Sequence, residues 1–271
     1  MGWEFLWIFA IIALVLSAVG FYKFVYFLSI GYGFSVAGIG VALAIMSLVG
    51  AFPQSAGVEH YILYALLVIY GIRLSGFLLI RELKNISFKK TEVFKDTLNK
   101  SEEKAMPVFV KATIWICVAV LYVAQTSPVF FRIYNGTETS ALVWVGIAIS
   151  VIAIAIEWIS DQQKSAQKAK NPNKVATEGL YKIVRCPNYF GEILFWTGLF
   201  VSSLDSLCTV GQWITAVLAY VAIVYIMFNG AQRLEKRQME RYKDDPEYNA
   251  YVEKTPIIIP LLPIYHLNKK N

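Results

Sequence analysis

Charged residues are scarce in this sequence. Only 16% of the 271 residues are Asp, Glu, Lys or Arg, and 57% are hydrophobic, whereas a soluble domain usually carries about 25% charged residues. The apolar residues form long blocks separated by short charged segments, and blocks of about 18 or more apolar residues are typical of membrane-spanning helices. The composition therefore excludes an ordinary soluble domain and predicts an all-α integral membrane protein.

Histidine and cysteine are also scarce. The two histidines, His60 and His266, are too few for the histidine clusters of membrane di-iron desaturases and hydroxylases. The three cysteines, Cys117, Cys186 and Cys208, are not spaced as metal ligands are. The sequence therefore predicts no metal site.

Seven apolar blocks predict a single bundle of about seven transmembrane helices. The first block follows Met1 without a basic segment or a small-residue cleavage site, so we expect a retained helix and not a signal peptide. The sixth block is short and contains Asn188 and Glu192. The expected spans are residues 3–22, 28–52, 60–80, 107–131, 141–160, 188–204 and 208–230.

Lysine and arginine are distributed unevenly between the two ends of these spans. With seven spans, four segments lie on the same side of the membrane as the C terminus: 23–27, 81–106, 161–187 and 231–271. These four segments hold all but three of the 25 Lys and Arg residues. Of the three exceptions, only Arg132 is expected in a loop on the other side. The positive-inside rule therefore predicts an N terminus outside and a C terminus in the cytoplasm. The membrane would be the inner or plasma membrane in a bacterium, or the endoplasmic reticulum in a eukaryote.

The net charge of +6 is explained by this topology and by anionic lipid headgroups, without a nucleic-acid partner. No obligate protein partner is evident from the sequence. A subset of the cytoplasmic cations can still bind a phosphorylated cofactor.

The most informative segment begins at Glu178 and ends at Ser203. Gly179 permits a tight turn, and Pro187 suits the first turn of a helix. Asn188, Glu192 and Trp196 then share one helical face. A carboxylate and an amide inside a membrane helix are costly unless they are paired. Two interpretations stay open: a polar clasp between helices, or a polar pocket near the cytoplasmic surface.

The run GLYKIVRCPNYFGEI, residues 179–193, resembles the signature of the steroid 5-alpha-reductase-like membrane proteins. The resemblance extends over most of the chain. It includes the number of spans, the acidic helix end at Glu157–Asp161 and the charged tail that ends in TPIIIP. Cys186 stands where that family often has His, so no role is predicted for this side chain.

The resemblance implies an NADPH site in residues 107–271 and substrate-side helices in residues 1–106, within one transmembrane domain. Asn188 and Glu192 would hold the nicotinamide and its ribose, and Trp196 would pack one turn deeper. Tyr181 and Arg185 would approach the pyrophosphate, and Asp161 a ribose hydroxyl. Lys164 and Lys168 would bind the 2′-phosphate. Arg233 and Arg237 would bind phosphate from the other side of the site. Tyr189 and Arg73 complete the implied cofactor ligands.

The third span supplies a Tyr three residues before an Arg, as the family does, at Tyr70 and Arg73. The resemblance implies that Tyr70 donates a hydrogen bond to the carbonyl oxygen of an enone. The Gln-Glu pair of the steroid reductases has no counterpart in the second span, where Tyr32 is the best polar candidate. We therefore expect Tyr70 and Tyr32 to be catalytic and the substrate to be a lipophilic enone, either steroid-like or another lipid.

Two other functions remain open at this stage. The tail also resembles that of isoprenylcysteine carboxyl and phospholipid methyltransferases, which use S-adenosylmethionine. A non-enzymatic lipid-binding protein would instead pair the polar residues 73, 188 and 192 with one another and leave no cavity.

Overall fold

The computed structural model describes residues 2–91 and 107–268, with side chains omitted for residues 84–91. Every regular element in this part of the chain is a helix. Most of the expected cationic loop at 81–106 lies outside the described residues. The structure divides into two compact units, residues 1–143 with 203–216, and residues 144–202 with 217–271. Each unit is described by itself, and the expected division of roles at residue 106 stays a prediction.

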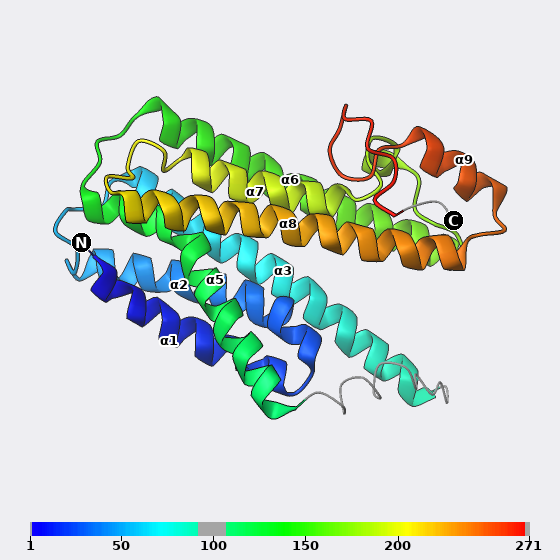
Figure 1. Ribbon diagram of the computed structural model, residues 1–271, viewed down its shortest axis with the longest axis horizontal. Helices are drawn as coiled ribbons and strands as arrows, with labels where there is room; N and C mark the ends of the chain where they lie inside the picture. The colour runs from blue at the N-terminus through cyan, green and yellow to red at the C-terminus, as the bar shows by residue number, and fades with distance from the viewer. Residues whose placement is uncertain (1, 92–106, 269–271) are drawn as a thin grey trace. The chain divides into compact units, whose positions relative to one another are not determined.

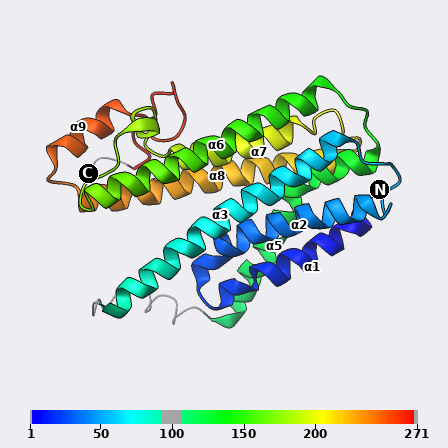
Figure 2. The same cartoon turned by 180° about the vertical axis from the view of Figure 1, so that it is seen from behind.

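The first unit is built from four long helices and three short 3-10 turns. Figures 1 and 2 show α1, α2 and α3 running side by side, with α5 crossing α1. The elements are η1 (Trp3–Phe5), α1 (Leu6–Ser17), η2 (Ala18–Phe21), η3 (Phe24–Leu28), α2 (Ile30–Leu48), α3 (Val58–Thr91) and α5 (Val108–Asn135).

Small residues bring α2 and α3 into backbone contact. A Cβ atom added at Gly71 would lie 2.2 Å from the Gly33 carbonyl oxygen, so no larger residue fits there without movement. The Ser75 hydroxyl donates to the Ile30 carbonyl oxygen at 2.6 Å across the same crossing. Such close approach is how helices associate where lipid removes the hydrophobic drive between them.

The second unit contains most of α6 (Ala141–Lys170), η4 (Gly179–Lys182), α7 (Pro187–Val201), most of α8 (Val210–Arg241) and α9 (Pro246–Lys254). Figure 2 shows α6, α7 and α8 side by side. Gly198 of α7 lies against Gly146 and Ser150 of α6, where an added Cβ would come within 2.3 Å of the Ser150 hydroxyl. The close packing against α6 fixes the rotation of α7 about its axis, and so determines which of its side chains point away from α6.

Six helices in the described residues are long and apolar enough to cross a membrane, which supports an integral membrane protein. They match six of the seven expected spans: Trp3–Phe21, Phe24–Leu48, Val58–Leu83, Val108–Asn135, Ala141–Lys170 and Val210–Arg241. The remaining expected span, 188–204, corresponds to α7, which has only 15 residues. At about 1.5 Å per residue α7 is shorter than the roughly 30 Å hydrocarbon core, so a count of seven spans stays a prediction.

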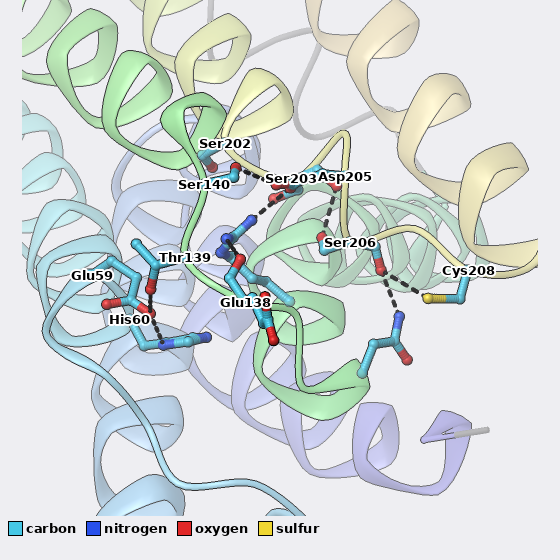
Figure 3. A network of polar contacts seen from close by, with 12 residues as sticks. Glu59, His60, Glu138, Thr139, Ser140, Ser202, Ser203, Asp205, Ser206 and Cys208 are labelled. Carbon is cyan, nitrogen blue, oxygen red and sulfur yellow. Dashed lines mark hydrogen bonds and ion pairs between the residues drawn. The ribbon is translucent and has the colours of Figure 1, made fainter.

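Arg132 does not lie in a loop, as the sequence suggested, but in the last turn of α5, where it is fully buried. Its guanidinium donates to Asp205 at 2.7 Å and to the Glu138 carbonyl oxygen at 3.0 Å. Figure 3 shows this polar network, in which Ser140 also donates to Asp205 and Thr139 donates to Glu59. The network joins the first turn of α3 to the loops that follow α5 and α7 within the first unit.

Candidate functional site

The turn before α7 is held by two glutamine side chains of α6. Gln163 accepts a hydrogen bond from the Leu180 amide at 2.8 Å, and Gln167 accepts from the Thr177 and Glu178 amides at 2.9 and 3.0 Å. Gly179 has φ +67°, a conformation that L side chains rarely adopt. The predicted tight turn is confirmed, and it places Tyr181 in the interior.

The start of α7 is fixed by backbone pairing with the C-terminal segment. Pro187 occupies the first turn as predicted. The amides of Arg185 and Cys186 donate to the carbonyl oxygens of Pro256 and Ile257, each at 2.9 Å. Burial raises the pKa of the Cys186 thiol to about 12, so this side chain is a neutral packing group.

A basic pocket lies beside this turn, with a volume of about 230 Å³. Its lining comes from α6, from the turn before α7 and from the C-terminal part of α8. Five lining side chains are cationic and none is a carboxylate; the cations are Lys164, Lys168, Arg185, Arg237 and Arg241. Such a lining favours a polyanionic ligand, because charge-assisted hydrogen bonds to phosphate are short and strong.

The aromatic residue Tyr242 orders two of these cations. Lys168 donates to the Tyr242 hydroxyl at 2.8 Å and lies 5.3 Å from the centre of its ring. The Arg241 guanidinium lies 5.5 Å from the same ring. Tyr242 is buried, so it fixes part of the lining before any ligand binds.

Arg185 forms a buried ion pair with Glu235 of α8 at 2.8 Å. Its Nε atom is buried without a hydrogen-bond partner among the described residues, and so is the hydroxyl of Tyr248. Burial raises the pKa of Tyr248 to about 12, so its phenol is protonated and can donate. Both groups are therefore buried donors without an acceptor; Arg185 lines the basic pocket, and Tyr248 lines a second pocket that shares Val175 with it.

The polar face of α7 is built as the sequence predicted. Glu192 and Trp196 are buried and Asn188 is half-buried. Gly191 allows α7 to approach Glu157 of α6, because an added Cβ would come within 2.5 Å of the Glu157 side chain. The Asn188 amide makes no hydrogen bond within the described part of the chain, so it is available to a ligand.

In the first unit, Tyr70 donates a hydrogen bond to the Tyr32 hydroxyl at 3.1 Å, and both side chains are buried. The ring of Tyr122 lies 5.0 Å from that of Tyr32. The Arg73 guanidinium lies 5.9 Å from the centre of the Tyr70 ring. The structure thus brings together the two residues expected to be catalytic, with Arg73 beside them.

A family model described as "Protein of unknown function (DUF1295)" matches residues 34–255. The chain belongs to the DUF1295 family. The match extends from within α2 to the residue after α9, so it includes the basic pocket and Tyr70 of this DUF1295 protein, whereas Tyr32 lies just before it.

One curated relative of this DUF1295 protein is steroid 5-alpha-reductase DET2 from Gossypium hirsutum, 23% identical over 137 residues. The aligned part covers 46% of each chain, so the DUF1295 protein spans less than half of that relative's length. No solved structure gives a significant match. The partial match supports the predicted resemblance at the level of a reductase-like membrane family, and the roles of individual motif residues stay predictions.

Some residues of this DUF1295 protein differ from the expected set. Arg233 is exposed and does not line the basic pocket, whereas Arg241, one turn beyond Arg237, does. Asp161 is half-buried, and its charge contributes to raising the pKa of Tyr181, although burial is the larger cause. The phosphate role of Arg233 and the ribose role of Asp161 stay predictions.

Two further residues of the site region escaped the sequence interpretation. Tyr248 lies on α9, a helix that was not expected. Gln125, one turn after Tyr122 on α5, is 3% exposed, and its amide has no hydrogen-bond partner among the described residues. For Gln125 the sequence does offer a signal, since a glutamine stands within an expected span. A buried amide in a membrane helix is costly without a hydrogen-bond partner, so such a residue is a candidate site residue.

Proposed function

We propose that this protein is a membrane-embedded, NADPH-dependent reductase of the activated C=C bond of a lipophilic substrate. The observation that carries the proposal is the basic pocket, which five cations and no carboxylate line. A dinucleotide with a pyrophosphate and a 2′-phosphate has the charge that such a lining complements. The partial similarity to steroid 5-alpha-reductase DET2 supports the same reaction class.

The residues present fit such a cofactor. The unpartnered Nε atom of Arg185 and hydroxyl of Tyr248 are donors suited to a phosphate oxygen. Asn188 and Glu192 would orient the nicotinamide and its ribose from the polar face of α7, with Trp196 packed one turn deeper. When bound, NADPH would supply the hydride that reduces the β carbon of the enone.

Tyr70 and Tyr32 are proposed to stabilise the charge that develops on the substrate's carbonyl oxygen. As hydride adds to the β carbon, the C=C bond becomes an enolate, whose oxygen a phenol can hydrogen-bond. A proton from solvent water then adds to the α carbon of the enolate and completes the saturated ketone. Because Tyr70 donates to the Tyr32 hydroxyl in the structure, we assign the direct hydrogen bond to the substrate oxygen to Tyr32 and a supporting role to Tyr70.

The proposal is tested with purified protein in detergent, titrated with NADPH, NADH and S-adenosylmethionine. We expect binding of NADPH in preference to both others. A cavity lined by cations is unfavourable for S-adenosylmethionine, because its sulfonium is positive. Binding of S-adenosylmethionine without NADPH would instead identify a methyltransferase, and binding of neither would favour a non-enzymatic lipid-binding protein.

Reduction is then assayed by NADPH oxidation with one steroid enone and one linear-chain enone. We expect Tyr32→Phe and Tyr70→Phe to lower the rate by about 100-fold or more and to leave NADPH affinity unchanged. Tyr61→Phe on the same helix is the matched control. Rates equal to that control would remove the tyrosine pair from the mechanism.

The topology is proposed with the pocket in the cytoplasm, where NADPH is supplied. Cysteine labelling of Lys170→Cys and Glu138→Cys in intact cells, with Cys117 and Cys208 replaced, tests it. We expect only the Glu138→Cys protein to react with an impermeant reagent added outside. Labelling of both positions from outside would contradict the topology.

A further inference from the structure

The C-terminal segment Thr255–Asn268, here named the strap, contains neither helix nor strand yet is closely bound to the second unit. Its first part pairs through its backbone with Arg185 and Cys186 before α7. Ile257 and Ile258 are buried, and the Ile257 amide donates to the Ile264 carbonyl oxygen at 2.9 Å. The strap therefore folds back on itself and leads its last residues to α8.

Those last residues converge on Glu235, which is 1% exposed. The amides of Leu267 and Asn268 donate to one carboxylate oxygen at 2.9 and 3.0 Å, and the Asn268 side chain donates to it at 2.8 Å. The other oxygen accepts from Arg185 and lies 3.2 Å from His266 Nδ1. A buried carboxylate with this many donors is held in one position.

Arg185 is thereby fixed from two sides. The same Nη2 atom that pairs with Glu235 also donates to the Tyr265 carbonyl oxygen of the strap. Arg185 is one of the five cations of the basic pocket. An arginine side chain loses considerable rotamer freedom when it is ordered, and here the strap and Glu235 order it without a ligand.

We propose that Glu235 and the strap residues Tyr265–Asn268 are positioning elements of the anion site, holding Arg185 in the orientation that binds a phosphate group. This inference rests on the proposed function, which makes the physiological ligand a dinucleotide. The part of the dinucleotide that Arg185 would bind is its pyrophosphate. The Arg185 Nε atom is buried without a hydrogen-bond partner among the described residues, so an acceptor oxygen of the ligand would satisfy it.

The test measures the affinity of the full-length protein for NADPH and for inorganic pyrophosphate, and the melting temperature without ligand. Glu235→Gln keeps the shape and removes the charge. Asn268→Ala is milder, because it removes strap contacts and leaves the ion pair of Arg185 with Glu235 intact. Glu240→Gln, an exposed position on the same helix, is the matched control.

We expect Glu235→Gln to weaken both ligands by roughly tenfold or more and Asn268→Ala to weaken them by a smaller factor, with no change for Glu240→Gln. A lower melting temperature with wild-type affinities would overturn the inference and make the strap a packing element only. If Glu235→Gln does not fold, unchanged affinity in Asn268→Ala overturns it equally. Wild-type protein that binds pyrophosphate but not NADPH would refute the proposed function alone, and binding of neither would refute both.

Discussion

Lys164→Gln offers a sharp test of the basic pocket, because NADPH and NADH differ only in the 2′-phosphate. Lys164 is a half-buried lining residue of the pocket on α6. A hydrogen bond to a charged group contributes about 1.5–3 kcal/mol, and partial solvent screening lowers the expected value to about 1–2 kcal/mol. The predicted loss of NADPH affinity is therefore about 5- to 30-fold, with NADH affinity nearly unchanged.

The assay is equilibrium titration of both dinucleotides at low salt, where screening is weakest. Lys170→Gln is the control, because Lys170 lies on the same helix, is exposed and does not line the pocket. An equal loss of affinity for NADPH and NADH would show that Lys164 contacts a part of the cofactor that both dinucleotides share, and not the 2′-phosphate. No loss for either would show that the pocket is not the dinucleotide site.

Three further predictions concern other parts of the chain. Glu192→Gln should weaken NADPH binding by about 1–3 kcal/mol without lowering the melting temperature; a destabilised variant with wild-type affinity would indicate a structural polar pair. Asp205→Ala should cost about 3–5 kcal/mol of stability, because it removes the carboxylate that compensates the charge of the buried Arg132; a melting temperature within a degree or two of wild type would contradict this. Cys186 should resist alkylation at pH 8 while the exposed Cys208, in the loop before α8, reacts. Since burial raises the thiol pKa, the stabilisation from Cys186 should be present below pH 9 and lost as the pH rises toward 12; labelling of both thiols at equal rates would refute it.

The spans and the polar face of α7 could be predicted because each depends on local sequence. Apolar block length predicts a membrane helix, and a spacing of four residues places Asn188 and Glu192 on one face. The expected span 188–204 runs past the end of α7 at Val201, and residues 202–206 are mostly polar. They instead form turns, where Ser202 and Ser206 donate to nearby carbonyl oxygens.

The C-terminal region shows where local reasoning reaches its limit. Asp245 followed by Pro246 is typical of a helix end, because the residue before a proline is disfavoured in the helical conformation. In the structure, however, α8 already ends at Arg241, and Asp245 caps a new helix by accepting from the Glu247 and Tyr248 amides. A capping Asp followed by Pro is also a helix start signal. The contacts of Glu235 with the strap join residues more than 30 positions apart, and no periodicity encodes them.

The basic pocket stands on helices that continue, without a break, from segments apolar enough to span a membrane. Lys164 and Lys168 are one turn apart on α6, as are Arg237 and Arg241 on α8. The direction in which each pair points is therefore set by the rotational phase of a long helix. One inserted residue advances that phase by about 100° and would swing a cation pair out of the pocket, whereas seven residues, close to two full turns, would restore it. Length changes between the membrane and the pocket should thus be tolerated in whole turns only.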